Sequence, residues 1–190
     1  GNPADGDPPA GLDYDLWLGP APRRPFSRQR FHETWRWHGD YGNGDLGNQG
    51  VHSMDLARWG LGVGLPTRIR PAAADSTSDK LRCEFDFPCR RKRLVFETRP
   101  WTPGASGIAG ATFYGSEGTM HVDHFGYRTW LGPRLEPGPS ASAGTTEFER
   151  FVAAVRSRNR ADLGAEIEEG HISTALCHLG NIALRLRRRV

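Results

Sequence analysis

A histidine stands where a glycine-rich polar loop meets a predicted helix, and this position suits proton transfer. The loop runs from Gly42 to Gly50, and His52 falls in the first turns of the helix that follows. Glycines let a ligand approach the backbone closely, and the positive end of a helix disfavours a charged imidazole. A neutral imidazole can accept the hydroxyl proton when an alcohol is oxidised to a carbonyl. We therefore predict His52 to be the catalytic residue.

The polar residues around this histidine are predicted to bind a hydroxyl-bearing substrate. Their amide and carboxylate groups supply the donors and acceptors that hydroxyls need. They are Asn43, Asp45, Asn48, Gln49 and Asp55. The spacing of three residues allows His52 and Asp55 to share one helix face. The structural alternative is that His52 only satisfies the start of the helix, while Asp55 pairs with Arg58.

Aromatic residues just before the loop are further candidates, because ring faces pack well against the C–H surfaces of sugars. Residues 30–38 alternate aromatic and polar side chains, which predicts a strand with Trp35 and Trp37 on one face. Arg36 would then lie on the opposite face and need a partner. We predict Arg36, Trp37 and Tyr41 to bind substrate; the alternative is that both tryptophans pack in the core.

The remaining sequence predicts a sheet built from short strands. The expected strands are 67–71, 81–87, 94–101, 109–114, 119–124 and 127–131, followed by a loop over 132–144. Connections this short require antiparallel neighbours. With helices on one side only, the other side of the sheet would expose Phe, Val, Trp and Leu. We therefore expect a two-layer α+β fold, with an open, mostly antiparallel sheet, helices on one face and a homo-oligomer formed through the other.

Three helices are expected, and their apolar spacing predicts which faces they bury. The first follows the loop and ends at Gly60-Leu61-Gly62. The second begins at Thr146, with a buried stripe of Phe148, Phe151, Val152 and Val155. The third runs from about residue 165 toward 189, and its Gly170 and Gly180 predict a close approach of helix and sheet.

Composition narrows the functional classes. The 190 residues carry 25 Lys and Arg against 22 Asp and Glu. The basic clusters fall in a predicted hairpin turn and at a helix end, which argues against a nucleic-acid interface. Three cysteines without a CxxC pair fit a reducing compartment and argue against zinc. No apolar run reaches the ~20 residues of a membrane span, so we expect a cytoplasmic protein without membrane contact.

Other histidines receive no functional assignment. His171, Cys177 and His178 are interpreted as packing residues of the last helix instead of a metal cluster, and no metal is expected. His121 and His124 lie near a predicted strand end and are assigned no role.

Several phrases of the chain resemble the C-terminal half of the bacterial Gfo/Idh/MocA oxidoreductases, the relatives of glucose-fructose oxidoreductase and inositol dehydrogenase. The phrases are Gly11-Leu12-Asp13-Tyr14-Asp15-Leu16-Trp17-Leu18-Gly19-Pro20, Trp35-Arg36-Trp37, Asp40 through His52, Tyr114 through Gly118, and Ile167 through Ile182. Together they span nearly the whole chain. The likeness implies a two-domain enzyme in which a Rossmann half binds NAD or NADP and this half supplies the substrate pocket and the oligomer interface.

The resemblance also implies roles for individual residues. In such enzymes a lysine from the Rossmann half and a histidine from the second half line the reacting carbon, and His52 matches that histidine. Many relatives place an aspartate four residues earlier, where this chain has Asn48, so Asp45 and Asp55 are candidates to replace it. Without βαβ alternation, we expect the chain to contain no Rossmann unit, and the fragment alone is expected to be inactive.

We predict residues 1–28 to be a linker with a short leading helix, and residues 29–190 to be the substrate-binding and oligomerisation domain. The predicted function is the substrate-binding part of an NAD(P)-dependent oxidoreductase acting on a sugar, a polyol or a related hydroxyl compound. Three alternatives stay open: an NAD-dependent redox-assisted glycoside hydrolase of the same architecture, a stand-alone carbohydrate-binding or oligomerisation module, and a nucleic-acid binder that uses the arginine clusters.

Overall fold

Two antiparallel sheets form one layer of the protein. The structure, a computed structural model, describes residues 5–71, 81–89, 91–98, 110–144 and 146–190. The first sheet has the order β1-β2-β3, formed by Arg68–Pro71, Arg82–Asp86 and Arg93–Glu97. The second has the order β4-β5-β6-β7, formed by Gly110–Tyr114, Gly118–Asp123, Gly126–Leu131 and Glu136–Ser142. The α+β class and the antiparallel pairing predicted from the sequence are confirmed, with the strands divided between two sheets.

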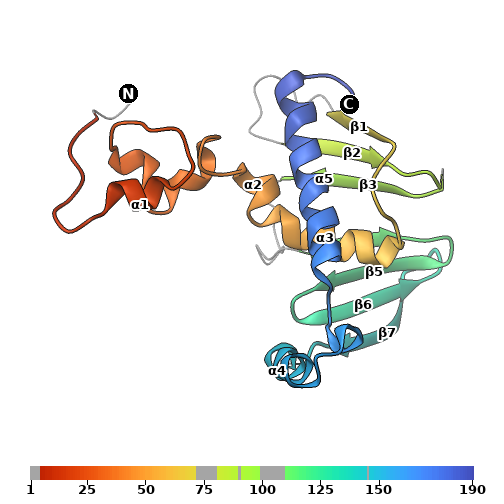
Figure 1. Cartoon of the computed structure of the whole chain (residues 1–190). Helices are drawn as coiled ribbons and strands as arrows, with labels where there is room; N and C mark the ends of the chain where they lie inside the picture. The colour runs from red at the N-terminus through yellow and green to blue at the C-terminus, as the bar shows by residue number, and fades with distance from the viewer. Residues whose placement is uncertain (1–4, 72–80, 90, 99–109, 145) are drawn as a thin grey trace.

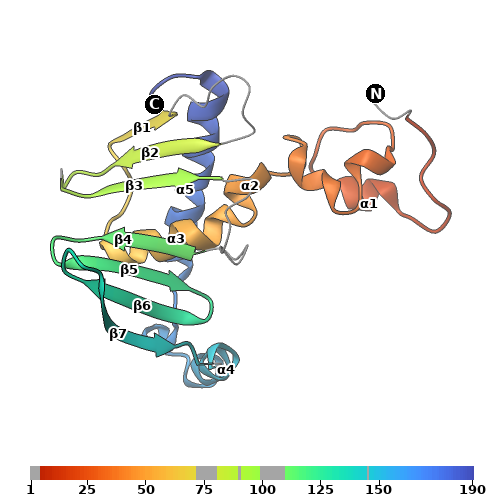
Figure 2. The ribbon, with the colours of Figure 1, turned by 180° about the vertical axis from the view of Figure 1, so that it is seen from behind.

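The two long helices α3 and α5 lie on the same side of these strands (Figure 1). Helix α3 spans Gly50–Leu61 and packs on β3 and β4, whereas α5 spans Ile167–Leu186 and packs on β1 and β2. Seen from behind, the strands are in front of both helices (Figure 2). Helix α3 ends at Gly62, whose left-handed backbone (φ 60°) closes the helix as the sequence predicts. One layer of helices on one face is the arrangement that the sequence predicts.

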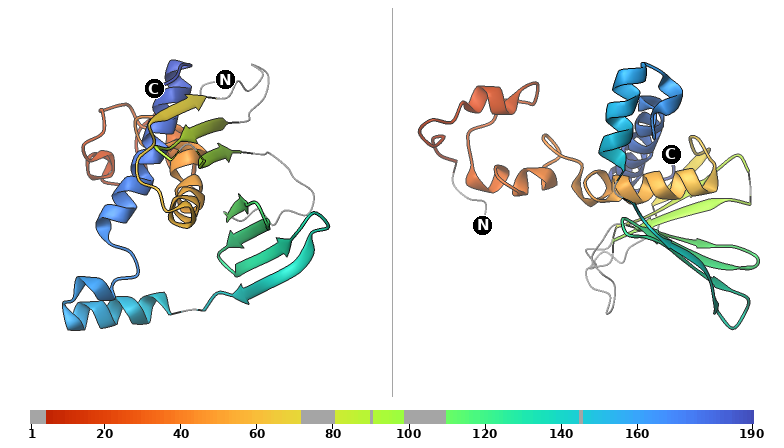
Figure 3. Two further views of the ribbon diagram at one scale, coloured as in Figure 1. Left: turned by 90° about the vertical axis from the view of Figure 1, so that its right-hand side faces the viewer. Right: turned by 90° about the horizontal axis from the view of Figure 1, so that it is seen from below.

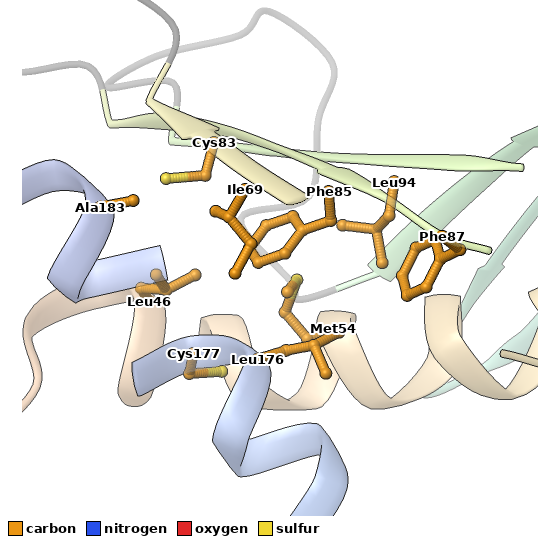
Figure 4. Packing of buried hydrophobic residues seen from close by; sticks show 10 residues of the cluster. All are labelled: Leu46, Met54, Ile69, Cys83, Phe85, Phe87, Leu94, Leu176, Cys177 and Ala183. Atoms are coloured by element: carbon orange, nitrogen blue, oxygen red, sulfur yellow. The ribbon is translucent and has the colours of Figure 1, made fainter. Parts of the chain in front are cut away.

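The core fills the space between the first sheet and the helices. Phe85 and Leu46 are fully buried, and Met54 and Leu176 meet them from α3 and α5 (Figure 4). Gly180 lets α5 approach closely, because a Cβ there would lie 2.6 Å from Leu46 Cδ2. The prediction for Gly180 is therefore confirmed, whereas a Cβ at Gly170 would meet nothing within 4 Å and the prediction for that glycine is wrong.

The outward face of the first sheet is charged, which differs from the apolar outer face expected from the sequence. Arg70 and Arg93 each place a nitrogen 3.0 Å from a carboxylate oxygen of Asp86. Arg82 pairs with Glu97 at 3.3 Å. The apolar residues of these strands alternate with the charged ones and all turn toward the helices, except Val95, which is 42% exposed. Period-two alternation therefore puts most of the apolar surface of these strands into the core.

Residues 5–41 form a separate N-terminal module that projects from the body (Figures 1 and 3). It contains helix α1 (Tyr14–Leu18) and the 3₁₀ helices η1 (Arg28–Arg30) and η2 (Thr34–Trp37). Its centre is a group of contacting rings, Tyr14, Trp17, Phe26, Phe31 and Tyr41, with centroid distances of 5.1 to 5.7 Å. These rings come from both sides of residue 28, where the sequence places a domain boundary; that boundary stays a prediction.

The strand predicted over residues 30–38 is wrong, because this segment forms η1 and η2 with local hydrogen bonds. The Trp35 N–H donates to the Phe31 carbonyl at 3.0 Å, and the His38 N–H donates to the Trp35 carbonyl at 3.0 Å. Glu33 turns the chain with a positive φ of 61°. The argument that placed Arg36 opposite both tryptophans therefore fails, because it required an extended backbone.

The loop predicted over 132–144 is also wrong, because most of it forms strand β7. This strand contains Pro137 and Pro139, and it lies at the edge of its sheet. Proline removes a backbone donor, which an edge strand tolerates on its open side. The Thr129 hydroxyl donates to the Pro139 carbonyl at 2.6 Å, and the register shifts between Arg128 and Trp130.

Helix α4 exposes the apolar stripe that the sequence assigns to the core. It spans Glu147–Ser157 and contacts the short helix η3 (Arg160–Asp162) at the far end of the second sheet (Figure 1). Phe148 and Phe151 are 79% and 61% exposed, and Val152 and Val155 are 44% and 46% exposed. The helix was correctly predicted, but its burial was not.

Parts of some predicted features lie outside the described residues. These are the end of the strand predicted over 94–101, Ala109 at the start of the next strand, and Arg90 in the basic hairpin turn.

Candidate functional site

His52 lies at the start of α3 and is exposed to solvent. The one-turn helix α2 (Gly44–Gly47) precedes it and is anchored in the core by Leu46, which is fully buried. Gly50 lies so close to the sheet that a Cβ would be 2.8 Å from the Phe96 ring. The loop is thereby held tightly against the sheet while the histidine two residues later faces solvent. The ring is therefore accessible to a ligand, and the catalytic role of His52 stays a prediction.

A second histidine, His124, lies against His52. Their ring centroids are 6.0 Å apart and the ring planes meet at 68°. His124 directly follows β5, so the pair joins the start of α3 to the end of a strand from the second sheet. Sequence reasoning gave His124 no role, because nothing in the local sequence indicates that the β5–β6 turn lies beside α3.

A cavity of about 740 Å³ is lined by His124 but not by His52. It is enclosed by the β5–β6 turn, the end of β7 and the first residue of α4. Its lining residues are His124, Phe125, Ser142, Ala143, Gly144 and Glu147. The volume falls within the ~300–1,000 Å³ typical of small-molecule sites. The hydroxyl of Ser142 and the carboxylate of Glu147 could hydrogen-bond a polar ligand there.

Asp55 takes part in a buried network that joins α3 to α5. The Arg58 guanidinium is 5% exposed and donates from Nε to the Ser173 hydroxyl at 2.8 Å. It also pairs with the Glu169 carboxylate and donates to the Val63 carbonyl at 3.2 Å. The Ser173 hydroxyl in turn donates to Asp55. These contacts fit the structural alternative for Asp55, whose predicted role in substrate binding stays a prediction.

The other predicted polar residues lie in α2 and its flanks, one to two turns before His52. Asp45 and Asn48 are half-buried, whereas Asn43 and Gln49 are exposed. The Asn43 carbonyl accepts a hydrogen bond from Asn181 Nδ2 at 2.9 Å, which fixes this segment to α5. Their proximity to His52 in the chain keeps all four as predicted substrate-binding residues.

The aromatic candidates belong to the N-terminal module. Arg36 pairs with Glu33 at 2.8 Å and lies over the Trp35 ring at 5.9 Å from its centroid. Trp37 is 55% exposed, and Tyr41 packs against Trp17 with centroids 5.2 Å apart. The structure therefore divides the predicted substrate-binding residues into two groups, one around His52 and one in this module.

The cysteines are free thiols in two different environments. Cys83 and Cys177 are buried, and this burial raises the pKa of each from 9.0 to about 11. Cys89 is exposed. His171 and His178 are exposed as well, so their interpretation as packing residues is wrong, whereas Cys177 does pack in the core.

Across the residues that the structure describes, no group of three or more His, Cys, Asp and Glu side chains could hold a metal ion. None of the described helices is long and apolar enough to cross a membrane.

Comparison with known proteins finds a family model that matches part of the chain. Residues 4–80 match the Gfo/Idh/MocA family described as "Oxidoreductase family, C-terminal alpha/beta domain". This match over residues 4–80 agrees with the sequence resemblance to the Gfo/Idh/MocA oxidoreductases. No curated protein matches the chain at a significant level.

Solved structures share the fold. UDP-N-acetylglucosamine 3-dehydrogenase from Acidithiobacillus ferrooxidans aligns with a TM-score of 0.54 and 13% identity over 72% of this chain and 46% of its own. A Thermotoga maritima protein assigned as an oxidoreductase aligns with a TM-score of 0.54 and 12% identity, over 74% and 45% of the two chains. The Bacillus subtilis protein yvaA, also assigned as an oxidoreductase, gives a TM-score of 0.53 and 12% identity, over 77% and 52%. The chain spans about half the length of these structures.

The described strands pair differently from the parallel strands of a Rossmann unit. The strands within the described ranges pair antiparallel, and no parallel βαβ unit is formed among them. The GxGxxG pattern of residues 42–47 does not have the setting of a Rossmann loop, because it comes after the 3₁₀ helix η2, with no strand before it, and forms the one-turn helix α2. The predicted use of NAD or NADP stays a prediction.

Proposed function

We propose that this chain is the substrate-binding and assembly part of an NAD(P)-dependent oxidoreductase that acts on a sugar, a polyol or a related hydroxyl compound. Support comes from the family match and from the likeness to a dehydrogenase of a nucleotide sugar. The observation that carries the proposal is the exposed imidazole of His52 beside His124 and its cavity. The dinucleotide would be held mainly by a separate Rossmann domain.

In this proposal His52 accepts the proton of the reacting hydroxyl. A neutral imidazole has a free ring nitrogen for that purpose. The network of Arg58, Ser173 and Asp55 would act indirectly, because it fixes α3 against α5 and so holds the His52 backbone in place. The polar side chains of α2 and the cavity would orient the remaining hydroxyls.

The proposal is tested by measuring sugar affinity with calorimetry. The panel is D-glucose, myo-inositol and UDP-N-acetylglucosamine, titrated into the whole chain. We expect His52→Gln to weaken the binding at least tenfold, because it removes a group in direct contact with the ligand. The matched control is His178→Gln, another exposed histidine on a helix, which should change affinity less than twofold. Equal affinity for both variants, or no heat with any ligand, would contradict the proposal.

We also propose that copies of the chain assemble through the outer face of the sheets, as the sequence predicts. The available surface is mixed: Val95 and Tyr114 are exposed, and the first sheet also carries ion pairs such as Arg70–Asp86. Such an interface would rely on ion pairs as well as apolar contact, so it should weaken with salt. Sedimentation at 50 mM and 500 mM NaCl tests this, and a monomer at both salt concentrations would refute it.

A further inference from the structure

The N-terminal module contains a cavity of its own, of about 500 Å³. It lies between α1 with its following loop and the segment after η2. Its lining residues are Trp17, Leu18, Pro20, Ala21, Pro22, Trp35, Asp40 and Tyr41. The module projects from the body that carries α3 and both sheets (Figure 3), so this cavity is separate from the one beside His124.

Three of the side chains that line this cavity are aromatic, and contacts with neighbouring rings hold Trp17 in place. Trp17 packs against the Phe31 ring at 5.1 Å and the Tyr41 ring at 5.2 Å between centroids. Phe31 is 8% exposed, so the side of the Trp17 ring that contacts Phe31 is shielded from solvent. Trp35 contributes a third ring and remains 37% exposed. Aromatic rings held rigidly at an open cavity are suited to stacking against a flat, weakly polar ligand.

Asp40 gives the same cavity one carboxylate. Its Oδ2 is 2.5 Å from the Arg24 guanidinium, so the pair is close to neutral. Oδ1 is not part of that ion pair and can accept a hydrogen bond from a ligand hydroxyl. The nearby charge is balanced, which disfavours a strongly charged ligand and favours a neutral one with hydroxyl groups.

We propose that the Trp17, Trp35, Tyr41 and Asp40 cavity is a saccharide-binding site, distinct from the site proposed at His52. A pyranose ring would stack on the indole rings while its hydroxyls donate to Asp40. The proposal does not depend on the oxidoreductase activity. It predicts that the chain holds a neutral saccharide through the module even when the His52 site is disabled.

The test follows the indole N–H signals of the six tryptophans by NMR during titration of the whole chain. The probes are maltotriose, cellotriose and chitotriose. We expect at least one of them to shift the Trp17 and Trp35 signals, with His52→Gln leaving these shifts unchanged. The absence of shifts at both tryptophans with all three probes would overturn the proposal.

Three variants separate the cavity from its surroundings. Trp35→Ala should weaken the binding of the active probe about tenfold, and Asp40→Asn should weaken it several-fold while keeping the shape of the cavity. Trp59→Ala is the control, because this tryptophan of α3 is 75% exposed and does not line the cavity; the affinity of this variant should stay within twofold. An effect of Trp59→Ala equal to that of Trp35→Ala would contradict the assignment.

A peptide probe distinguishes a second class of ligand. Aromatic cavities also bind extended proline-rich peptides. If a proline decamer shifts the two indole signals and no saccharide does, the saccharide assignment is wrong.

Asp40→Asn is a nearly isosteric change, so its effect on binding can still be interpreted if Trp35→Ala lowers the stability of the module.

Discussion

Two glycines of helix α5 should respond in opposite ways to the same substitution. A Cβ at Gly180 would lie 2.6 Å from Leu46 Cδ2 and 3.2 Å from Phe85 Cζ, and both neighbours are fully buried. A Cβ at Gly170 would have no atom within 4 Å. Alanine in place of glycine favours a helix by ~0.8–1 kcal/mol, whereas an extra carbon in a filled core costs about 1–3 kcal/mol.

The expected result is a split between the two variants. Gly170→Ala should raise the free energy of unfolding by up to about 1 kcal/mol. Gly180→Ala should leave it unchanged or lower it by up to about 2 kcal/mol, since overpacking exceeds the helix preference there. Urea denaturation followed by circular dichroism measures both, and at this chain length 1 kcal/mol corresponds to roughly 2–4 °C in Tm. Equal stabilisation by both substitutions would refute the close packing of α5 on Leu46 and Phe85.

Two further predictions concern the buried polar groups. Arg58→Ala should lower the free energy of unfolding by about 2–4 kcal/mol, because it removes the hydrogen bonds of this side chain to Ser173 and Val63. The control is Arg156→Ala, which changes an exposed arginine. Equal urea midpoints for the two variants would contradict the role of Arg58. The buried thiols Cys83 and Cys177 should make stability fall between pH 9 and 11, because they ionise near 9.0 when unfolded but only near 11 when folded. Each would cost about 2–3 kcal/mol over that interval. The slope of stability against pH should be shallower in Cys83→Ala than in Cys89→Ala, and an unchanged slope would count against this prediction.

The sequence predicted the sheets well, because period-two alternation and turn residues are local signals. The six strands expected from the sequence match β1 to β6 within a few residues at the described ends. The seventh strand was missed, because Pro137 and Pro139 are typical of loops unless the strand lies at an edge. The segment around Trp35 was misread, because alternation of aromatic and polar residues over a few positions does not distinguish a strand from a pair of 3₁₀ turns.

Burial was harder to predict than secondary structure, since it depends on what else is near each face. The apolar stripe of α4 follows helical spacing, but in this chain α4 stands at the far end of the second sheet and leaves Phe148 and Phe151 exposed. Arg58 shows the opposite case, because a charged side chain, of a type usually found at the surface, is buried. Its guanidinium donates a hydrogen bond to Ser173 and pairs with Glu169, both on α5.

Features of the candidate site that depend on neighbouring residues in the sequence could be predicted. Contacts between segments that are far apart in the sequence could not. The exposure of His52 at a helix start follows from the glycine-rich loop and the helical spacing after it. Its contact with His124, and the cavity next to that residue, come from the packing of α3 on the second sheet. The aromatic residues grouped with His52 from the sequence instead form their own cluster, because residues 5–41 fold as a projecting module.

The most direct test of the central claim is an NMR titration that follows the imidazole protons of the seven histidines. The ligands are myo-inositol, D-glucose and UDP-N-acetylglucosamine, added to the whole chain. If His52 and His124 face the substrate together, their ring signals should shift together and saturate at the same ligand concentration, while those of His171 and His178 stay fixed. Saturable binding that leaves both His52 and His124 unshifted would contradict the account.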